Sequence, residues 1–150
     1  MKVISEPGTF FADSSFTLVA NAHSKNIKTN EKGEEVVHYY ITDGIYQSFN
    51  MTSTHDVPVS VKTLDDLSGK PMKNTVIWGR ACDPHDIVKS NFKLPEIQCG
   101  DWLVFPNAGA YSITTSTLFN GFPNHPVYYF IEKEMKYDIK SKILLANYNF

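Results

Sequence analysis

The sequence is poor in the residues that bind nucleic acids. Only one of its 150 residues is an arginine, Arg80, and its formal net charge is −2. Arginine is the side chain best suited to bidentate contacts with phosphate, and positive charge supplies most of the affinity for a nucleic-acid backbone. The composition therefore argues against DNA or RNA as a partner.

Long apolar runs and cysteines are also scarce. The longest apolar run covers residues 127–131, whereas a membrane helix needs about 20 residues. The N-terminal segment reaches Glu6 before an apolar core of signal-peptide length has formed. Two cysteines, Cys82 and Cys99, are too few for a disulfide framework or a four-ligand zinc site. We therefore expect no membrane contact and a reducing, cytoplasmic location.

Aromatic and β-branched residues are abundant, and they fall in short segments. Eighteen residues are Phe or Tyr, and the apolar fraction of 42% suffices for a packed core. Alternating or β-branched patterns predict strands at residues 10–22, 36–42, 59–64, 75–79, 102–105, 111–115 and 127–131. We expect loops at 26–35 and 65–74 and a helical turn at 84–90, while 45–51 fits a short helix or a continued strand. The pattern predicts a mainly all-β domain, a barrel or a sandwich, with one or two short helices.

Candidate functional residues follow two of the predicted strands. Cys82 and Asp83 follow the predicted strand at 75–79. A thiol is mostly protonated at neutral pH and could donate a proton, act as a nucleophile, or simply be a small buried hydrophobe. Asp43 precedes Gly44 at the end of another strand. Its carboxylate fits either a turn that accepts backbone N–H groups or a site for a cationic ligand.

Two further segments leave similar alternatives open. Glu6-Pro7-Gly8 is either a solvated turn or a carboxylate aimed at a cationic ligand. Tyr111 ends a loop of small residues, so its hydroxyl could bind phosphate or carboxylate, or its ring could lie half in the core. The histidines lack the spacing of a metal-binding pair, and we expect no metal site. They are His23, His38, His55, His85 and His125.

Taken in order, several segments resemble the C-terminal part of eukaryotic ornithine decarboxylases. These segments are ISEPG at 4–8, SFTL at 15–18, YYITDGIYQSFN at 39–50, IWG at 77–79 followed by Cys82-Asp83, LPE at 94–96, GDWLVF at 100–105, GAY at 109–111 and FNGF at 119–122. The family consists of pyridoxal-phosphate decarboxylases that pair an (α/β)8 barrel with a β domain, as in alanine racemase-like enzymes. The resemblance implies that residues 1–131 form that β domain, with 1–9 a remnant of the last barrel strand and 132–150 a divergent tail.

The resemblance also implies roles for the substrate-binding residues. Asp43 and Asp83 would meet the distal ammonium of ornithine from opposite subunits of a dimer, and Thr42 would line the same site. Phe119 would pack near the ligand across the dimer interface. Cys82 would protonate the carbon that has lost CO2, so that putrescine forms. Two carboxylates facing one ammonium would disfavour substrates that lack the distal charge.

Other residues would contact pyridoxal phosphate. Glu6, followed by Pro7 and Gly8, would accept the pyridinium N–H, and Tyr111 would bind the phosphate. Where the family has an arginine that binds the phosphate, this sequence has Thr9, and Arg80 with Ala81 replaces a Pro-Thr pair before the cysteine. A hydroxyl cannot replace a bidentate cation.

The barrel of the family carries the lysine that binds the cofactor covalently, and no lysine here has the matching context. We therefore expect this chain to hold no cofactor covalently and to be inactive by itself. Two functions remain open. The chain is either the C-terminal part of an ornithine decarboxylase, whose partners are a diamine and a barrel-containing chain or homodimer partner, or a catalytically inactive truncated paralogue that acts as a binding or structural domain.

Overall fold

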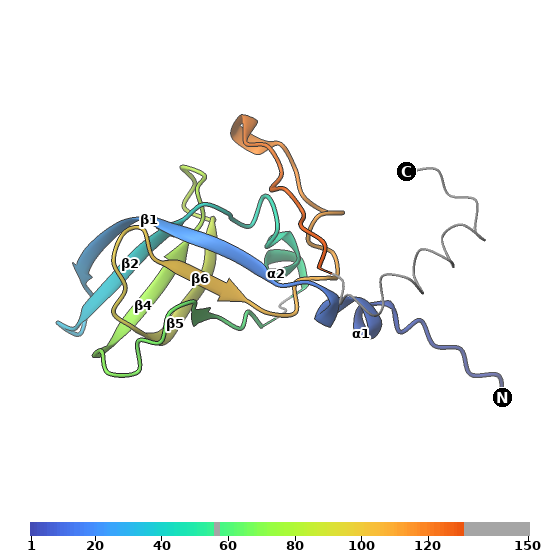
Figure 1. Cartoon of the computed structure of the whole chain (residues 1–150), viewed down its shortest axis with the longest axis horizontal. Coiled ribbons are helices and arrows are strands. Elements are labelled where there is room, and N and C mark those ends of the chain that lie inside the picture. The colour runs from blue at the N-terminus through green and yellow to red at the C-terminus, as the bar shows by residue number, and fades with distance from the viewer. Residues whose placement is uncertain (56–57, 131–150) are drawn as a thin grey trace.

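The computed structural model describes residues 1–55 and 58–130, and these residues form a mostly β structure built on one curled, half-barrel sheet (Figure 1). Its strands are β1 (Leu18–Thr29), β2 (Glu35–Ile41), β3 (Lys62–Thr63), β4 (Met72–Trp78), β5 (Ile87–Pro95) and β6 (Trp102–Phe105). The helical segments are α1 (Gly8–Ala12), η1 (Asp13–Ser15), α2 (Asn50–His55) and η2 (Phe119–Gly121). The predicted fold class is confirmed.

The sheet has the strand order β3-β6-β1-β2-β4-β5, and only β2 and β4 run parallel. The long strand β1 joins its two halves, because residues 18–21 pair with β6 while its second half pairs with β2. A register shift between Ala22 and Ser24 lies at this change of partner. Such irregularities bend a strand and increase its twist, which lets the sheet curl.

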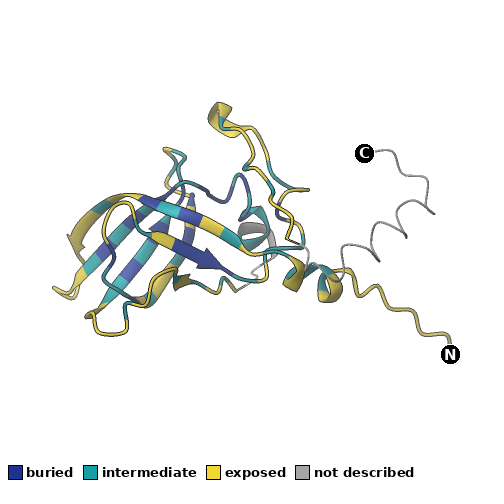
Figure 2. Ribbon diagram, viewed as in Figure 1, coloured by how far each residue is buried: buried dark blue, intermediate teal, exposed yellow. Residues whose placement is uncertain are grey.

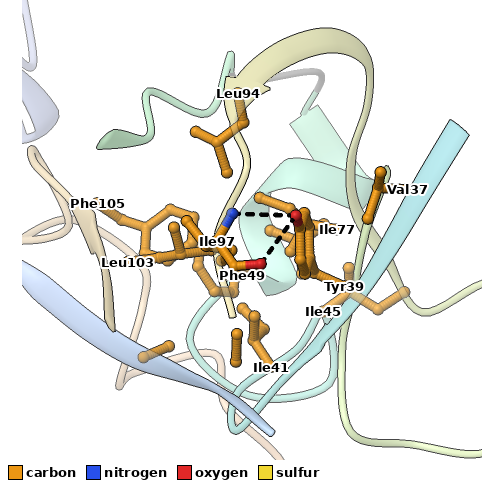
Figure 3. Packing of buried hydrophobic residues seen from close by; sticks show 13 residues of the cluster. Val37, Tyr39, Ile41, Ile45, Phe49, Ile77, Leu94, Ile97, Leu103 and Phe105 are labelled. Carbon is orange, nitrogen blue, oxygen red and sulfur yellow. Dashed lines mark hydrogen bonds between the residues drawn. The ribbon is translucent and has the colours of Figure 1, made fainter. Parts of the chain in front are cut away.

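The core lies on the inner face of the curled sheet. Along the strands, buried apolar side chains alternate with more exposed ones (Figure 2). In β2 the buried residues are Val37, Tyr39 and Ile41, as period-two alternation requires. The Tyr39 hydroxyl accepts a hydrogen bond from Ile97 N (3.1 Å) and donates one to Ile97 O (3.3 Å) (Figure 3). These bonds satisfy a buried phenol and fix the segment between β5 and β6.

Several local predictions were wrong. Residues 10–15 are helical rather than extended, 111–115 form bends and a turn, and 127–130 have no regular structure. Half of the loop predicted at 26–35 is strand, and only a tight turn remains between β1 and β2. In this turn Asn30 Oδ1 accepts the backbone N–H groups of Lys32 and Glu34. Such side-chain acceptors stabilise a tight turn, so β1 extends to Thr29.

Other boundaries moved, and some predictions lie outside the described residues. The segment 84–90 contributes the start of β5 rather than a helical turn, and 45–51 is a turn leading into α2. The expected tail at 132–150 is not among the described residues, and 1–7 have no regular structure. Within the described ranges, no helix is both long and apolar enough to cross a bilayer.

Candidate functional site

Asp43 lies in a turn that follows β2 directly. Its side chain is fully buried, and Oδ1 accepts backbone hydrogen bonds from Gly44 (2.6 Å) and Ser48 (3.0 Å). This oxygen therefore has the structural role of a turn acceptor. The second oxygen, Oδ2, makes no hydrogen bond within the described part of the chain. One oxygen of this carboxylate thus shapes the loop, and the other lies 3.5 Å from His125 Nε2.

Thr42 fixes the start of the same loop to the sheet. Its backbone N–H donates to Asn21 O (3.0 Å), and its hydroxyl oxygen accepts from Asn21 N (3.1 Å). These two bonds continue the pairing of β1 with β2 past Ile41. Thr42 therefore holds Asp43 at a fixed distance from the sheet end, and its own hydroxyl is already engaged.

Cys82 and Asp83 lie in the loop that follows β4. Cys82 is exposed, so the alternative of a buried small hydrophobe was wrong. The Asp83 carboxylate accepts from the backbone N–H of His85 (2.7 Å) and from the Tyr46 hydroxyl (2.9 Å), and His85 Nδ1 lies 2.9 Å away. These bonds hold the pKa of Asp83 below its usual range, and the bond from the His85 backbone has the largest effect. Asp83 is therefore ionised at neutral pH, as a cation-binding residue must be.

A third carboxylate, that of Asp86, joins the two loops. It is fully buried and accepts from the backbone N–H groups of Ile45 (2.9 Å) and Ala81 (2.8 Å). Gly44 and Gly79 both pack against it, and a Cβ on either would lie within 2.5 Å of Asp86 Oδ1. Burial raises the pKa of Asp86, while its two backbone hydrogen bonds act in the opposite direction. Asp86 thus positions the Asp43 loop relative to the Cys82 loop.

Tyr46 brings the predicted substrate residues together. It lies in the Asp43 loop, its hydroxyl donates to Asp83, and its ring stacks on Phe119 with centroids 4.2 Å apart. Its carbonyl also accepts from the Thr117 backbone (2.8 Å), which anchors the chain before Phe119. The hydrogen bond to Asp83 is the largest reason why the pKa of Tyr46 is raised, so the phenol stays a neutral donor.

The sequence reasoning missed Tyr46 and Asp86. The paired glycines were the available signal for Asp86, because a glycine at a strand end often permits a close approach of another group. Tyr46 carried no signal beyond its place three residues after Asp43. Across the described residues, no three His, Cys, Asp or Glu side chains converge to hold a metal ion.

The predicted cofactor residues lie at a separate edge. Glu6 and Gly8 are exposed, and Tyr111 is half exposed with a positive φ of 52°. The loop before Tyr111 is bound to the helical segment that follows Gly8, because Gly109 N donates to Asp13 O (3.0 Å). Gly109 is required there, since a Cβ would lie 1.8 Å from Ala12 O.

This edge carries part of what pyridoxal phosphate needs. A carboxylate on Glu6 suits a pyridinium N–H, and a phenol on Tyr111 suits a phosphate oxygen. Both lie on segments that the Gly109 contact joins, and both residues are exposed. The chemistry of these two side chains therefore suits the cofactor, although Thr9 offers only a hydroxyl next to Gly8.

Comparison with known proteins shows which proteins the chain is similar to. A family model described as "Pyridoxal-dependent decarboxylase, C-terminal sheet domain" matches residues 9–109. Ornithine decarboxylase of Schizosaccharomyces pombe is 40% identical over 138 residues, covering 86% of this chain and 31% of the relative. Antizyme inhibitor 2 of Xenopus laevis is 35% identical over 137 residues, covering 86% and 30%.

Solved structures show the same fold. The arginine decarboxylase of Paramecium bursaria Chlorella virus bound to agmatine has a TM-score of 0.75 and 29% identity, covering 82% of this chain and 32% of that one. The lysine/ornithine decarboxylase of Vibrio vulnificus complexed with putrescine has a TM-score of 0.66 and 27% identity, covering 81% and 32%. The chain spans about a third of the length of each of these proteins.

Proposed function

Since this chain belongs to the pyridoxal-dependent decarboxylases, whose C-terminal sheet domain it forms, we propose that it supplies the diamine-binding and proton-donating part of an ornithine decarboxylase-like active site. The reaction would convert ornithine to putrescine and CO2. A barrel-bearing chain would supply the other wall, and a homodimer would bring Asp43 and Asp83 from opposite subunits to one ligand.

The observation that carries this proposal is the meeting of three segments at Tyr46. Its loop holds Asp43, its hydroxyl binds Asp83, and its ring stacks on Phe119. Tyr46 thus holds the Asp43 loop and the ionised Asp83, with the exposed thiol in the adjacent position, together in one chain. In a homodimer, each copy would present its Asp43 to one ligand and its Cys82 and Asp83 to the other. A cation and a carbon that needs a proton are the partners that these groups suit.

Each residue would have a distinct task in the reaction. The carboxylates would hold the distal ammonium and so orient the substrate. Glu6 and Tyr111 would contact pyridoxal phosphate, which when bound would supply the electron sink for the pair left when the bond to CO2 breaks. The Cys82 thiol would then give its proton to that carbon, and the thiolate would recover a proton from water.

A hybrid enzyme tests the proposal. This chain would replace the matching C-terminal segment of the S. pombe ornithine decarboxylase, to which it is 40% identical. We expect CO2 release from ornithine, with putrescine as product. A folded, dimeric hybrid that binds pyridoxal phosphate but releases no CO2 from ornithine, lysine or arginine would contradict the proposal.

A non-catalytic binding domain is the second candidate function. The residue that favours it is Thr9, which removes a cation from the predicted phosphate site. A relative of similar identity is named antizyme inhibitor rather than decarboxylase. The inactive outcome of the hybrid experiment would support this second function.

Replacing Cys82 with alanine in the hybrid should change the product rather than abolish CO2 release. Without the thiol, protonation at the correct carbon slows while the bond to CO2 still breaks, so the putrescine share should fall by about tenfold or more. Product analysis by chromatography, with CO2 measured in parallel, checks this result. Cys99→Ala is the matched control, because Cys99 is also an exposed thiol but follows β5 rather than β4. An unchanged product ratio would remove Cys82 from the mechanism.

Replacing Thr9 with arginine should tighten the binding of pyridoxal phosphate in the hybrid. One charge-assisted pair contributes about 1.5–3 kcal/mol, which corresponds to roughly 10–150-fold in affinity. Equilibrium titration followed by cofactor absorbance measures the change. Thr9→Lys serves as a comparison, because a point charge lacks the bidentate geometry and should have a smaller effect. Equal affinity in all three proteins would show that the phosphate is held elsewhere.

A further inference from the structure

The segment 119–125 lies across the Asp43 loop, and we call it the 119–125 strap. Phe119 at its start stacks on Tyr46. Near its end, His125 Nε2 lies 3.0 Å from Thr42 O and 3.5 Å from Asp43 Oδ2. Contacts at both ends therefore hold the strap against the loop that carries the predicted ammonium-binding carboxylate.

The His125 contact fills the free side of Asp43. Two oxygens surround Nε2, and a carbonyl oxygen can only accept, so this nitrogen carries a hydrogen and donates it. The side chain of Asp43 has no accessible surface, and Oδ2 has no hydrogen bond from the described residues. The imidazole N–H therefore lies 3.5 Å from the oxygen that an ammonium group would bind.

Arg80 holds the middle of the strap. Its Nη2 donates to Pro123 O (2.8 Å), its Cζ lies 4.5 Å from the Phe122 ring centroid, and its Nε donates to Gln47 Oε1 (3.4 Å). Gln47 belongs to the Asp43 loop, so Arg80 joins strap and loop directly. A guanidinium can make such planar and stacking contacts together.

An open hollow of about 310 Å³ lies beside these contacts, lined by His23, Thr42, Arg80 and Phe122. This volume is at the lower end of the range for small-molecule pockets, roughly 300–1,000 Å³. Two of the lining residues, Arg80 and Phe122, belong to the strap contact itself. The hollow therefore lies beside Thr42, the neighbour of Asp43 in the chain, and the strap forms part of its wall.

We propose that His125 occupies the ammonium subsite of Asp43 and that Arg80 holds it there, so that a diamine must displace the imidazole to bind. The two residues thereby set the affinity for the cationic ligand. This inference rests on the proposed function and adds a specificity-determining contact to the same site. A ligand with a single ammonium and no second anchor would gain too little to displace the strap.

Binding of putrescine to the hybrid enzyme, in which the barrel and the second subunit are present, tests the inference. Titration calorimetry would compare the unaltered protein with His125→Ala, Arg80→Ala, Asp43→Asn and Asn124→Ala. We expect His125→Ala to tighten putrescine binding by about tenfold and Arg80→Ala to tighten it by a smaller factor. Asp43→Asn keeps an oxygen for the turn but should weaken binding at least tenfold. Asn124, exposed in the strap, is the control and should leave the affinity unchanged.

The histidine signal gives an independent readout. In NMR spectra, the His125 ring resonances should move on addition of putrescine, and this movement should disappear in Asp43→Asn. Putrescine binding that requires Asp43 but is unchanged or weakened in His125→Ala would overturn the inference while leaving the proposed function intact. If no variant binds putrescine and Asp43→Asn changes nothing, both proposals fail together.

Discussion

Replacing Asp83 with asparagine in the hybrid enzyme should lower kcat/KM for ornithine by about 100-fold. The substitution keeps the shape of the side chain and removes its charge. Asp83 is ionised because the His85 backbone, the His85 ring and Tyr46 stabilise the carboxylate. An amide in its place cannot form the charge-assisted bond to an ammonium. Since this bond forms with the substrate already in the ground state, most of the loss should appear in KM.

A second aspartate supplies the control for this prediction. Asp66 is exposed in the loop between β3 and β4, and its pKa is also lowered by hydrogen bonds, chiefly from the Ser68 backbone. Asp66→Asn makes the same chemical change away from the site and should leave kcat/KM unchanged. For a substrate analogue without the distal amine, the wild-type hybrid and its Asp83→Asn variant should have the same kcat/KM. Equal losses for ornithine and this analogue would contradict the assigned role.

The sequence predicted the sheet best where local pattern and tertiary packing agree. Strands β2 and β4 were found because Val, Ile, Tyr and Trp alternate there between a core and a more exposed face. Strand β6 was found as a short apolar run, and Leu103, Val104 and Phe105 in it are all buried. The C-terminal strands predicted at 111–115 and 127–131 failed for the opposite reason. Their aromatic residues, including Tyr128 and Tyr129, are largely exposed, so no core selects an extended conformation.

The sequence could predict which residues belong to the candidate site but not the contacts that bring them together. Asp43, Cys82 and Asp83 could be identified as residues at strand ends, and the structure brings their loops together through Asp86. Neither this contact nor the Tyr46 bond to Asp83 is local in sequence. Asp86 binds Ile45, which is 41 residues away, and Tyr46 binds Asp83, which is 37 residues away. Patterns of one segment do not reveal which distant segment it will meet.

The contact between Gly79 and Asp86 leads to the second large prediction. Gly79→Ala would place a Cβ 2.1 Å from Asp86 Oδ1 and 2.3 Å from Oδ2. That carboxylate cannot move away cheaply, because it is fully buried and bound by two backbone N–H groups. Overpacking and the weakening of these bonds should together lower the free energy of unfolding by about 3–5 kcal/mol. Urea denaturation followed by tryptophan fluorescence measures the change.

Two further variants separate this overlap from a general intolerance of alanine. Gly69→Ala is the matched control, because nothing lies within 4 Å of its Cβ position, and it should change stability by less than about 0.5 kcal/mol. In an Asp86→Ala background the overlapping atoms are absent, so adding Gly79→Ala should cost less than about 1 kcal/mol. The two substitutions should therefore be strongly non-additive. Gly79→Ala could instead lower the free energy of unfolding by the same amount with and without the Asp86 carboxylate. In that case the carboxylate is not what requires glycine at position 79, and another contact must connect the Asp43 and Cys82 loops.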